Sequence, residues 1–210
     1  MTYILEEMYL NILSDTQKEL LPFLQKFKKE FLLVGWTAIA LQIGHRESID
    51  FDLFKEKPLN KNSIKKKIND LDAKRRFIFE DFDGIHYLIN EVKFTFFYYP
   101  FHLEAGAELQ KYIKMPDLLT LAAMKFYAMG RRAKWKDYVD IYFLLKDFFS
   151  IEMVSKKALE IYKEGYSEKL FRQQICYFEG IDYSEPIVWI VAPVSDEIIK
   201  EKLLELALNF

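Results

Sequence analysis

Two aspartates one residue apart, Asp50 and Asp52, are the side chains whose types and spacing best suit catalysis in this 210-residue chain. Residues two apart on a strand point to the same side and lie about 6–7 Å apart. Two carboxylates at that spacing raise each other's pKa, and burying them without a partner is costly. Mg²⁺, which prefers oxygen ligands, would remove that conflict and also hold substrate phosphates. The pattern alone is weak, because Asp-x-Asp is also common on exposed strands that bind nothing.

A glycine turn precedes these aspartates. Gly35, Trp36 and Thr37 follow the apolar run 31–34 and open an apolar segment, 37–43, that stops at Gly44. A strand, a glycine and a helix N-terminus present backbone N–H groups to a ligand, which suits phosphate. The polar loop 45–48 comes next, where His45 and Arg46 either contact phosphate or order the loop, with Arg46 pairing an acid.

The elements that would position these residues form a mixed α/β unit. Ser14 and Gln17 fit a capping box for a helix that runs to about Lys29. The segment 49–54 alternates, which predicts a strand with Ile49, Phe51 and Leu53 inward. Other apolar patterns predict a strand at 31–34, a helix at 37–43, a helix capped by Asn62 or Ser63, a hairpin turning at Asp83-Gly84 and a strand at 92–99.

The second half of the chain has a helical pattern. Pro116-Asp117 opens a helix that ends at Gly130, and residues 135–149, 152–164 and 195–208 also have helical spacing. Residues 172–193, with Pro186 and Pro193, favour irregular structure. We therefore expect an α+β fold with two domains: a mixed sheet with flanking helices over residues 1–110 and a helical bundle over residues 111–210.

Charge and composition exclude several classes of protein. The net charge of −2 argues against a protein whose overall charge attracts polyanions. Basic clusters lie at 65–67, 74–76 and 131–136, and such clusters are typical of solvated helix faces as well as of nucleic-acid contacts. The single cysteine, Cys176, cannot form an intramolecular disulfide, and no apolar run is long enough to cross a bilayer. We see no signal peptide and expect a cytoplasmic protein without a membrane partner. His86 and His102 lack partners at metal-ligand spacing, which favours structural roles.

Four charged residues of the helical half form a second group: Lys125, Lys136, Asp137 and Asp140. Taken alone, Lys136 and Asp140 are four residues apart on one helix and fit an ordinary surface ion pair. Asp137 and Asp140, three apart, share a face. The spacing by itself therefore favours a solvent-exposed helix face.

The two groups together resemble the AbiEii/AbiGii-type toxin family, nucleotidyltransferases of the polymerase-β-like superfamily. Residues 33–54 are similar to the family pattern Gly-Gly-Thr-Ala-x-Ala-Leu, Gly-His-Arg, Asp-x-Asp. Residues 117–145 resemble its Lys…Arg-Gly…Lys-Asp-x-x-Asp-Leu-Tyr block, with Arg131 or Arg132 as the arginine. The stretch 176–179 and Pro186 carry a weaker likeness. The resemblance covers most of the chain.

The resemblance implies an enzyme that transfers a nucleoside monophosphate from an NTP to an acceptor such as RNA, with Mg²⁺ as cofactor and a separately encoded antitoxin as partner. Asp50 and Asp52 would hold the metal. Gly35, Trp36, Thr37, Arg46 and Ser48 would bind the nucleotide. Lys125 and Lys136 would meet the triphosphate, balancing its charge across a cleft, and Asp137 and Asp140 would position them.

Two departures from the family pattern keep other functions open. Trp36 replaces the second glycine of the pair, and the superfamily's third carboxylate is missing from the strand at 92–99, where the relevant face carries Lys93, Thr95 and Phe97. Glu91 has the right parity but lies at the strand entrance. A nucleotidyltransferase-fold binding module that has lost transfer is therefore the alternative, and a transferase acting on a small molecule is a third.

Overall fold

The computed structural model describes residues 8–129 and 134–209, which form two units, Met1–Asp117 and Leu118–Phe210. The first unit combines a sheet with helices and the second is helical, which confirms the expected α+β class. Gly130, Arg131 and Arg132, which entered the sequence argument, lie outside the described residues. No helix in the described part of the chain is long and apolar enough to span a membrane.

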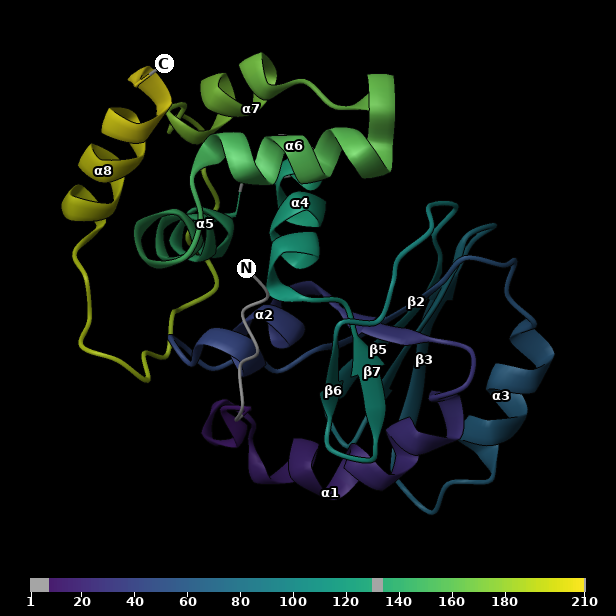
Figure 1. Ribbon diagram of the computed structural model, residues 1–210. Coiled ribbons are helices and arrows are strands. Elements are labelled where there is room, and N and C mark those ends of the chain that lie inside the picture. Colours follow the sequence, from purple (N-terminus) through teal and green to yellow (C-terminus); the bar gives the residue numbers. More distant parts are fainter. Residues whose placement is uncertain (1–7, 130–133, 210) are drawn as a thin grey trace. The chain divides into compact units, whose positions relative to one another are not determined.

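The first unit is built on a five-stranded mixed sheet with the strand order β1-β2-β5-β4-β3. Strands β2, β5 and β3 of this sheet are labelled in Figure 1. Only β2 and β5 are parallel; the other neighbours run antiparallel. The strands are β1 (Leu32–Val34), β2 (Phe51–Lys55), β3 (Arg75–Glu80), β4 (Gly84–Ile89) and β5 (Val92–Tyr98). The sequence of strand, helix, strand, helix and three strands is therefore confirmed.

One face of this sheet is buried under the helix α1 (Asp15–Leu24) and the turn that continues it. Phe23 packs on Phe94 with ring centroids 5.7 Å apart, and Phe27 on Phe96 at 4.7 Å. Edge-to-face and tilted rings of this kind add to the burial of apolar area. The helix α3 (Lys61–Asn69) is linked to the same region through Lys67, whose Nζ lies 4.8 Å from the Phe27 ring centroid.

Local capping chemistry explains where the helices start. Ser14 and Gln17 form the predicted capping box at α1, in which the Gln17 N–H donates to Ser14 Oγ at 3.2 Å. For α3 the prediction of Asn62 or Ser63 was wrong. Asn60 caps this helix, because its Oδ1 accepts from the Ser63 N–H at 3.0 Å.

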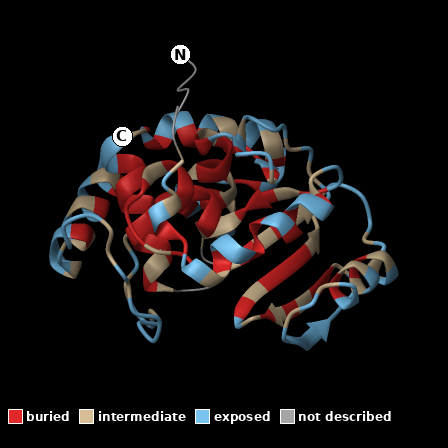
Figure 2. Cartoon of the chain, turned by 90° about the horizontal axis from the view of Figure 1, so that it is seen from below, coloured by how far each residue is buried: buried red, intermediate tan, exposed pale blue. Residues whose placement is uncertain are grey.

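Two strand predictions also need correction. β2 begins at Phe51, and Ile49, expected to point inward, is 58% exposed because it lies in the loop before the strand. The β3–β4 turn is not a two-residue Asp83-Gly84 turn. Gly84 is already in β4, and Asp81 Oδ1 closes the loop by accepting from the Gly84 N–H at 2.7 Å. The edge strand β3 is exposed along its whole length (Figure 2).

A second, two-stranded sheet was not predicted. β6 (Ala107–Leu109) and β7 (Ile113–Met115) pair antiparallel and belong to the first unit. Leu109, Ile113 and Met115 are fully buried. Residues 111–117, which we expected to open the helical domain, therefore complete the first unit instead.

The second unit contains five helices among the described residues: α4 (Leu118–Ala128), α5 (Trp135–Asp147), α6 (Ile151–Tyr162), α7 (Glu168–Ile175) and α8 (Asp196–Leu208). Four were predicted. The helix α7 overlaps the segment expected to be irregular, and its N-cap is Ser167, whose Oγ accepts from the Leu170 N–H at 3.4 Å.

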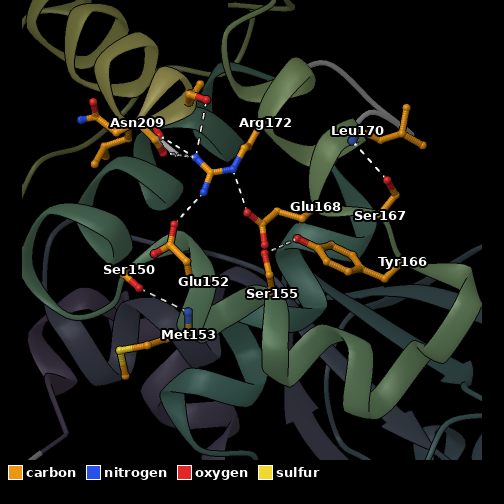
Figure 3. Close-up of polar contacts among 12 residues, drawn as sticks. Ser150, Glu152, Met153, Ser155, Tyr166, Ser167, Glu168, Leu170, Arg172 and Asn209 are labelled. Carbon is orange, nitrogen blue, oxygen red and sulfur yellow. Dashed lines mark hydrogen bonds and ion pairs between the residues drawn. The ribbon is translucent and has the colours of Figure 1, made fainter.

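Arg172 of α7 joins three helices of the second unit (Figure 3). Its guanidinium forms ion pairs with Glu152 of α6 at 2.6 Å and with Glu168 of α7 at 2.8 Å. It also donates to the carbonyls of Leu206 at 3.0 Å and Asn209 at 2.7 Å, at the C-terminal end of α8. The side chain is only 6% exposed, so the five donors of this buried cation need these acceptors.

Candidate active site

Gly35 begins the helix α2 (Gly35–Ile43) directly after β1 and lies against the carboxylate of Asp52. Its φ is +72°, and a Cβ atom at this position would lie 2.4 Å from Asp52 Oδ2. No side chain caps the start of α2, so N–H groups and the positive end of the helix dipole lie beside that carboxylate. Such a turn can bind an anion such as phosphate next to an oxygen ligand of a metal.

Asp50 and Asp52 are both half-buried; Asp52 is the second residue of β2, and Asp50 directly precedes the strand. Asp52 lies opposite Val34 of β1 and next to Thr95 of β5, and Thr95 lies opposite His86 of β4. Paired residues of neighbouring strands share a face, so Asp52, Thr95 and His86 form one row across the sheet. This is the face opposite the one that packs on α1, because Phe94 and Phe96 alternate with Thr95.

His86, for which the sequence favoured a structural role, therefore shares its face with Asp52, the predicted metal ligand. Its ring stacks on Phe79 with centroids 4.1 Å apart, and its Nδ1 has no hydrogen-bond partner among the described residues. Burial, helped by the charge of Lys93, lowers the pKa of His86 below its ordinary value. The imidazole is thus neutral near pH 7. The row that contains both His86 and Asp52 depends on the register of β4 against β5. The alternation of residues along the sequence does not determine that register.

The third carboxylate of the superfamily has no counterpart beside Asp52 on β5, where Thr95 occupies the position. Glu91 lies four residues before Thr95, or about 13 Å along a strand. It is in the β4–β5 turn with φ +65°, and it pairs with Lys74 at 3.6 Å. Among the described residues, no three His, Cys, Asp or Glu side chains come together as a metal cage.

Thr37 and Ser48 connect α2 to the loop that leads into β2. Thr37 is 1% exposed, and its hydroxyl lies 2.9 Å from Ser48 Oγ and also donates to the Asp50 carbonyl. The Ser48 carbonyl accepts from Gln17 Nε2 at 2.9 Å. Both hydroxyls thus make internal hydrogen bonds that hold the backbone of Asp50 in place.

Arg46 is 1% exposed, among the most deeply buried large side chains of the described chain. Its guanidinium carbon lies 5.4 Å from the Trp36 ring centroid, and its Nη1 donates to the Glu47 carbonyl at 2.8 Å. A desolvated cation over an indole face gains about 2 kcal/mol from the ring. The tryptophan that replaces the family's glycine is therefore in contact with the predicted nucleotide-binding arginine.

In the second unit, Lys125 of α4 and Asp137 of α5 form a buried ion pair. Lys125 Nζ lies 3.0 Å from Asp137 Oδ1, and the side chains are 10% and 6% exposed. Asp140 is completely buried in the same helix. The interpretation of α5 as an ordinary exposed helix was wrong, since most of its residues are buried.

Lys136 pairs with Glu185 rather than with Asp140. The distance from Lys136 Nζ to Glu185 Oε2 is 3.3 Å, and Lys134 pairs with the same glutamate. The hydrogen bond from Lys134, with the nearby charge of Lys136, keeps the pKa of Glu185 below its ordinary value. Glu185 was missed because its partners lie about fifty residues earlier in the sequence.

The donor set of the first unit fits Mg²⁺. Mg²⁺ usually binds one or two carboxylates together with water and substrate phosphates, rather than a cage made entirely of protein ligands. Asp50 and Asp52 supply such a pair of hard oxygen donors, half-buried beside a helix N-terminus. The absence of a three-residue cage in the described part of the chain is compatible with this mode of binding.

Comparison with known proteins gives two matches in sequence. The family model "Nucleotidyl transferase AbiEii toxin, Type IV TA system" matches residues 23–203. An uncharacterized protein of Aquifex aeolicus (strain VF5) is 30% identical over 179 residues, which cover 80% of this chain and 82% of that protein.

Solved structures match in fold. MenT4, a nucleotidyltransferase toxin from Mycobacterium tuberculosis H37Rv, has a TM-score of 0.56 and 12% identity, over 92% of this chain and 81% of its own. JHP933 from Helicobacter pylori has a TM-score of 0.52 and 16% identity, over 95% and 88%. At these identities the likeness establishes the shared fold.

Proposed function

Because this chain belongs to the AbiEii nucleotidyl transferase toxin family, we propose that it transfers a nucleoside monophosphate from an NTP to an acceptor hydroxyl. The observation that carries the proposal is the contact between the Gly35 turn and Asp52, where a Cβ atom would lie 2.4 Å from Oδ2. A phosphate on the N–H groups of that turn would be next to the carboxylates. Catalysis would then rest on positioning and charge stabilisation.

Asp50 and Asp52 would hold Mg²⁺, and the bound ion would supply neutralisation of phosphate charge. The acceptor oxygen forms a bond to the α-phosphorus while the bond to the bridging oxygen breaks. Pyrophosphate leaves with the bonding electron pair, and the hydroxyl proton is lost to water.

The remaining predicted residues take roles that follow their contacts. Thr37 and Ser48 would fix the backbone at Asp50, since both are committed to internal hydrogen bonds. Arg46, held against Trp36, would add positive charge near the nucleotide. We assign Lys125 and Lys136 to phosphate, with Asp137 and Glu185 as the carboxylates that orient them and buried Asp140 supporting α5.

Two further proposals come from the family alone. Type IV toxins act within toxin–antitoxin systems, so we propose a cognate antitoxin as partner. RNA is the acceptor we would test first, and the cytoplasm is the compartment in which both partners would be met.

Label transfer tests the function directly. The full chain would be incubated with each α-labelled NTP, Mg²⁺ and total cellular RNA, beside the double variant Asp50→Asn/Asp52→Asn. The chain offers a matched control in its second Asp-x-Asp, at the exposed residues Asp70 and Asp72. We expect label on RNA with the wild type and with Asp70→Asn/Asp72→Asn, and none with the first pair. Equal labelling by both double variants would contradict the metal assignment.

Thr95 favours one alternative, a module that binds nucleotide without transferring it, because it replaces an acid beside Asp52. The wild type would then bind NTP in an equilibrium titration yet label no acceptor. Expression in cells separates the two functions. Growth inhibition that disappears with Asp50→Asn supports transfer, and inhibition that survives the substitution supports the binding module.

A further inference from the structure

A cavity of about 430 Å³ lies in the first unit, among the segment before β1, the end of β2 and the chain that follows β5. A volume of this size is within the range of small-molecule sites. None of the residues assigned to catalysis or nucleotide binding lines it.

The cavity lies at the opposite end of β2 from Asp50, but its wall approaches Asp52. Its wall includes Leu32 and Phe54, which lie opposite each other in β1 and β2. The next pair on the same face is Val34 with Asp52. Phe54 is two residues from Asp52, so their side chains point the same way, about 6–7 Å apart.

Aromatic rings form much of the wall. The ring centroids of Phe54 and Tyr99 are 5.1 Å apart and those of Tyr99 and Phe101 5.2 Å apart. Tyr99 and Phe101 are only half-buried, and both line the cavity. Such rings can stack on a planar ligand such as a nucleobase.

The charged lining has an excess of cations, with four lysines and two glutamates. Lys55 pairs with Glu30 at 2.9 Å, and Lys28 with Glu108 outside the cavity at 2.6 Å. Within the described ranges, Lys29 and Lys114 make no ion pair within 4 Å, although Lys114 lies opposite Glu108 in the β6–β7 pair and its charge helps to keep the pKa of that carboxyl below its ordinary value, after the hydrogen bond from Lys28. Two lysines without ion pairs beside stacking rings favour a ligand that is both planar and anionic.

We propose that this cavity is a nucleotide subsite, in which a base stacks on Tyr99 and Phe101 and a phosphate contacts Lys29 and Lys114. The inference rests on the proposed function, because the nucleotide is either the incoming NTP or the terminal nucleotide of an RNA acceptor. A simple phosphate ion would make no use of the aromatic wall.

Isothermal titration of the full chain tests the subsite, with each NTP in one arm and a short oligoribonucleotide with a free 3′-hydroxyl in the other. The variants are Phe101→Ala, which removes a stacking ring, and Lys114→Glu on the exposed face of β7, which leaves the core intact. Lys66→Glu on α3 is the control, since Lys66 is exposed and is not part of the lining. Loss of one base–aromatic stack, about 1–3 kcal/mol, corresponds to binding weakened by about fivefold to 150-fold, and tenfold is near the lower end of that range.

We expect both cavity variants to weaken one ligand about tenfold while Lys66→Glu binds as the wild type does. Weakened NTP binding assigns the subsite to the incoming nucleotide, and weakened oligonucleotide binding assigns it to the acceptor. Unchanged binding of both ligands by both variants overturns the subsite, even where label transfer is observed. Cavity-dependent binding without label transfer would instead contradict the proposed function and leave the subsite standing.

Discussion

At the residue scale, two separate features of position 35 require glycine: its backbone conformation and its close approach to Asp52. Its φ of +72° disfavours any L side chain, and a Cβ atom would overlap the Asp52 carboxylate. The positive φ alone would lower the free energy of unfolding by roughly 1–2 kcal/mol for a residue other than glycine. The overlap of a Cβ atom with the Asp52 carboxylate would in addition move this predicted metal ligand. We therefore expect Gly35→Ala to abolish label transfer and to lower the free energy of unfolding, measured by chemical denaturation.

Gly180 separates these two effects. It has nearly the same φ, +68°, but a Cβ atom there would meet nothing within 4 Å. Gly180→Ala should carry the backbone cost alone and keep full transfer. If Gly35→Ala keeps transfer as well, the contact with Asp52 is not important for the site.

Thr37 gives a second prediction at this scale. Thr37→Val keeps the shape but removes the hydroxyl that bonds Ser48 and the Asp50 carbonyl. A buried polar group left without its partner costs about 1–3 kcal/mol. We expect a loss of unfolding free energy in that range and a fall in label transfer, because the backbone of Asp50 is released. Thr37→Ser, which keeps the hydroxyl, should restore both; failure to restore transfer would mean that the methyl group matters instead.

At the scale of the element, the sequence predicted what local chemistry determines. The Ser14–Gln17 capping box and the glycine stop at Gly44 depend on neighbouring residues and were correct. The β6–β7 hairpin was missed because its short strands are recognisable only by their burial in the first unit. The row that joins Asp52 to Thr95 and His86 depends on strand register, which long-range pairing sets.

The three-helix connection at Arg172 carries the prediction at this scale. Arg172→Met leaves Glu152, Glu168 and the last carbonyls of α8 without their shared donor. Removing one partner of a buried ion pair typically lowers the free energy of unfolding by about 3–5 kcal/mol. Because Glu152 is largely exposed to solvent, we expect a loss of about 3 kcal/mol or less for Arg172→Met. We expect faster hydrogen exchange in α8 together with a lower melting temperature. Arg76→Met, on the exposed strand β3, should change neither.

The same connection should weaken in acid. Hydrogen bonds from Ser150 and from the Glu152 backbone N–H, with Arg172 adding to them, lower the pKa of Glu152 below its ordinary value. A carboxylate with a depressed pKa stabilises the fold above its unfolded pKa, and this stabilisation is lost as the pH falls through the folded pKa. Exchange in α8 should therefore rise as the pH falls below about 4, relative to an unstructured reference peptide. Arg172→Met should show a smaller rise, and an equal rise would exclude Arg172 from the effect.

At the scale of the whole molecule, each of the two units carries residues that we propose for function, and the sequence singled these residues out on different grounds. Asp50 and Asp52 were proposed from their spacing on an expected strand, and the structure places Asp52 in β2 and Asp50 one residue before it. Lys125 and Asp137 were singled out only by the family resemblance, because helical spacing alone favoured an exposed face, and the structure joins them in a buried ion pair. Glu185 was not found at all, since its pairing with Lys136 depends on the tertiary fold.

Alkaline titration tests the packing of the second unit within the whole molecule. Burial raises the pKa of Tyr138 to about 12 and that of Tyr166 to about 12, from an ordinary value of 10.0. Above pH 10 the unfolded chain loses these phenolic protons before the folded chain does, so stability falls as the pH rises toward 12. Among thirteen tyrosines, absorbance at about 295 nm should thus show a late phase that coincides with the loss of helical circular dichroism.

Tyr138→Phe is the variant that makes this prediction specific. It removes the hydrogen bond to the Tyr177 carbonyl at 2.8 Å, so stability at neutral pH should fall by about 1 kcal/mol. It also removes one late-titrating group, so stability should then depend less steeply on pH above 10. A single titration step near pH 10 in a chain that keeps its helical signal would mean that Tyr138 and Tyr166 are open to water, against the packing described for the second unit.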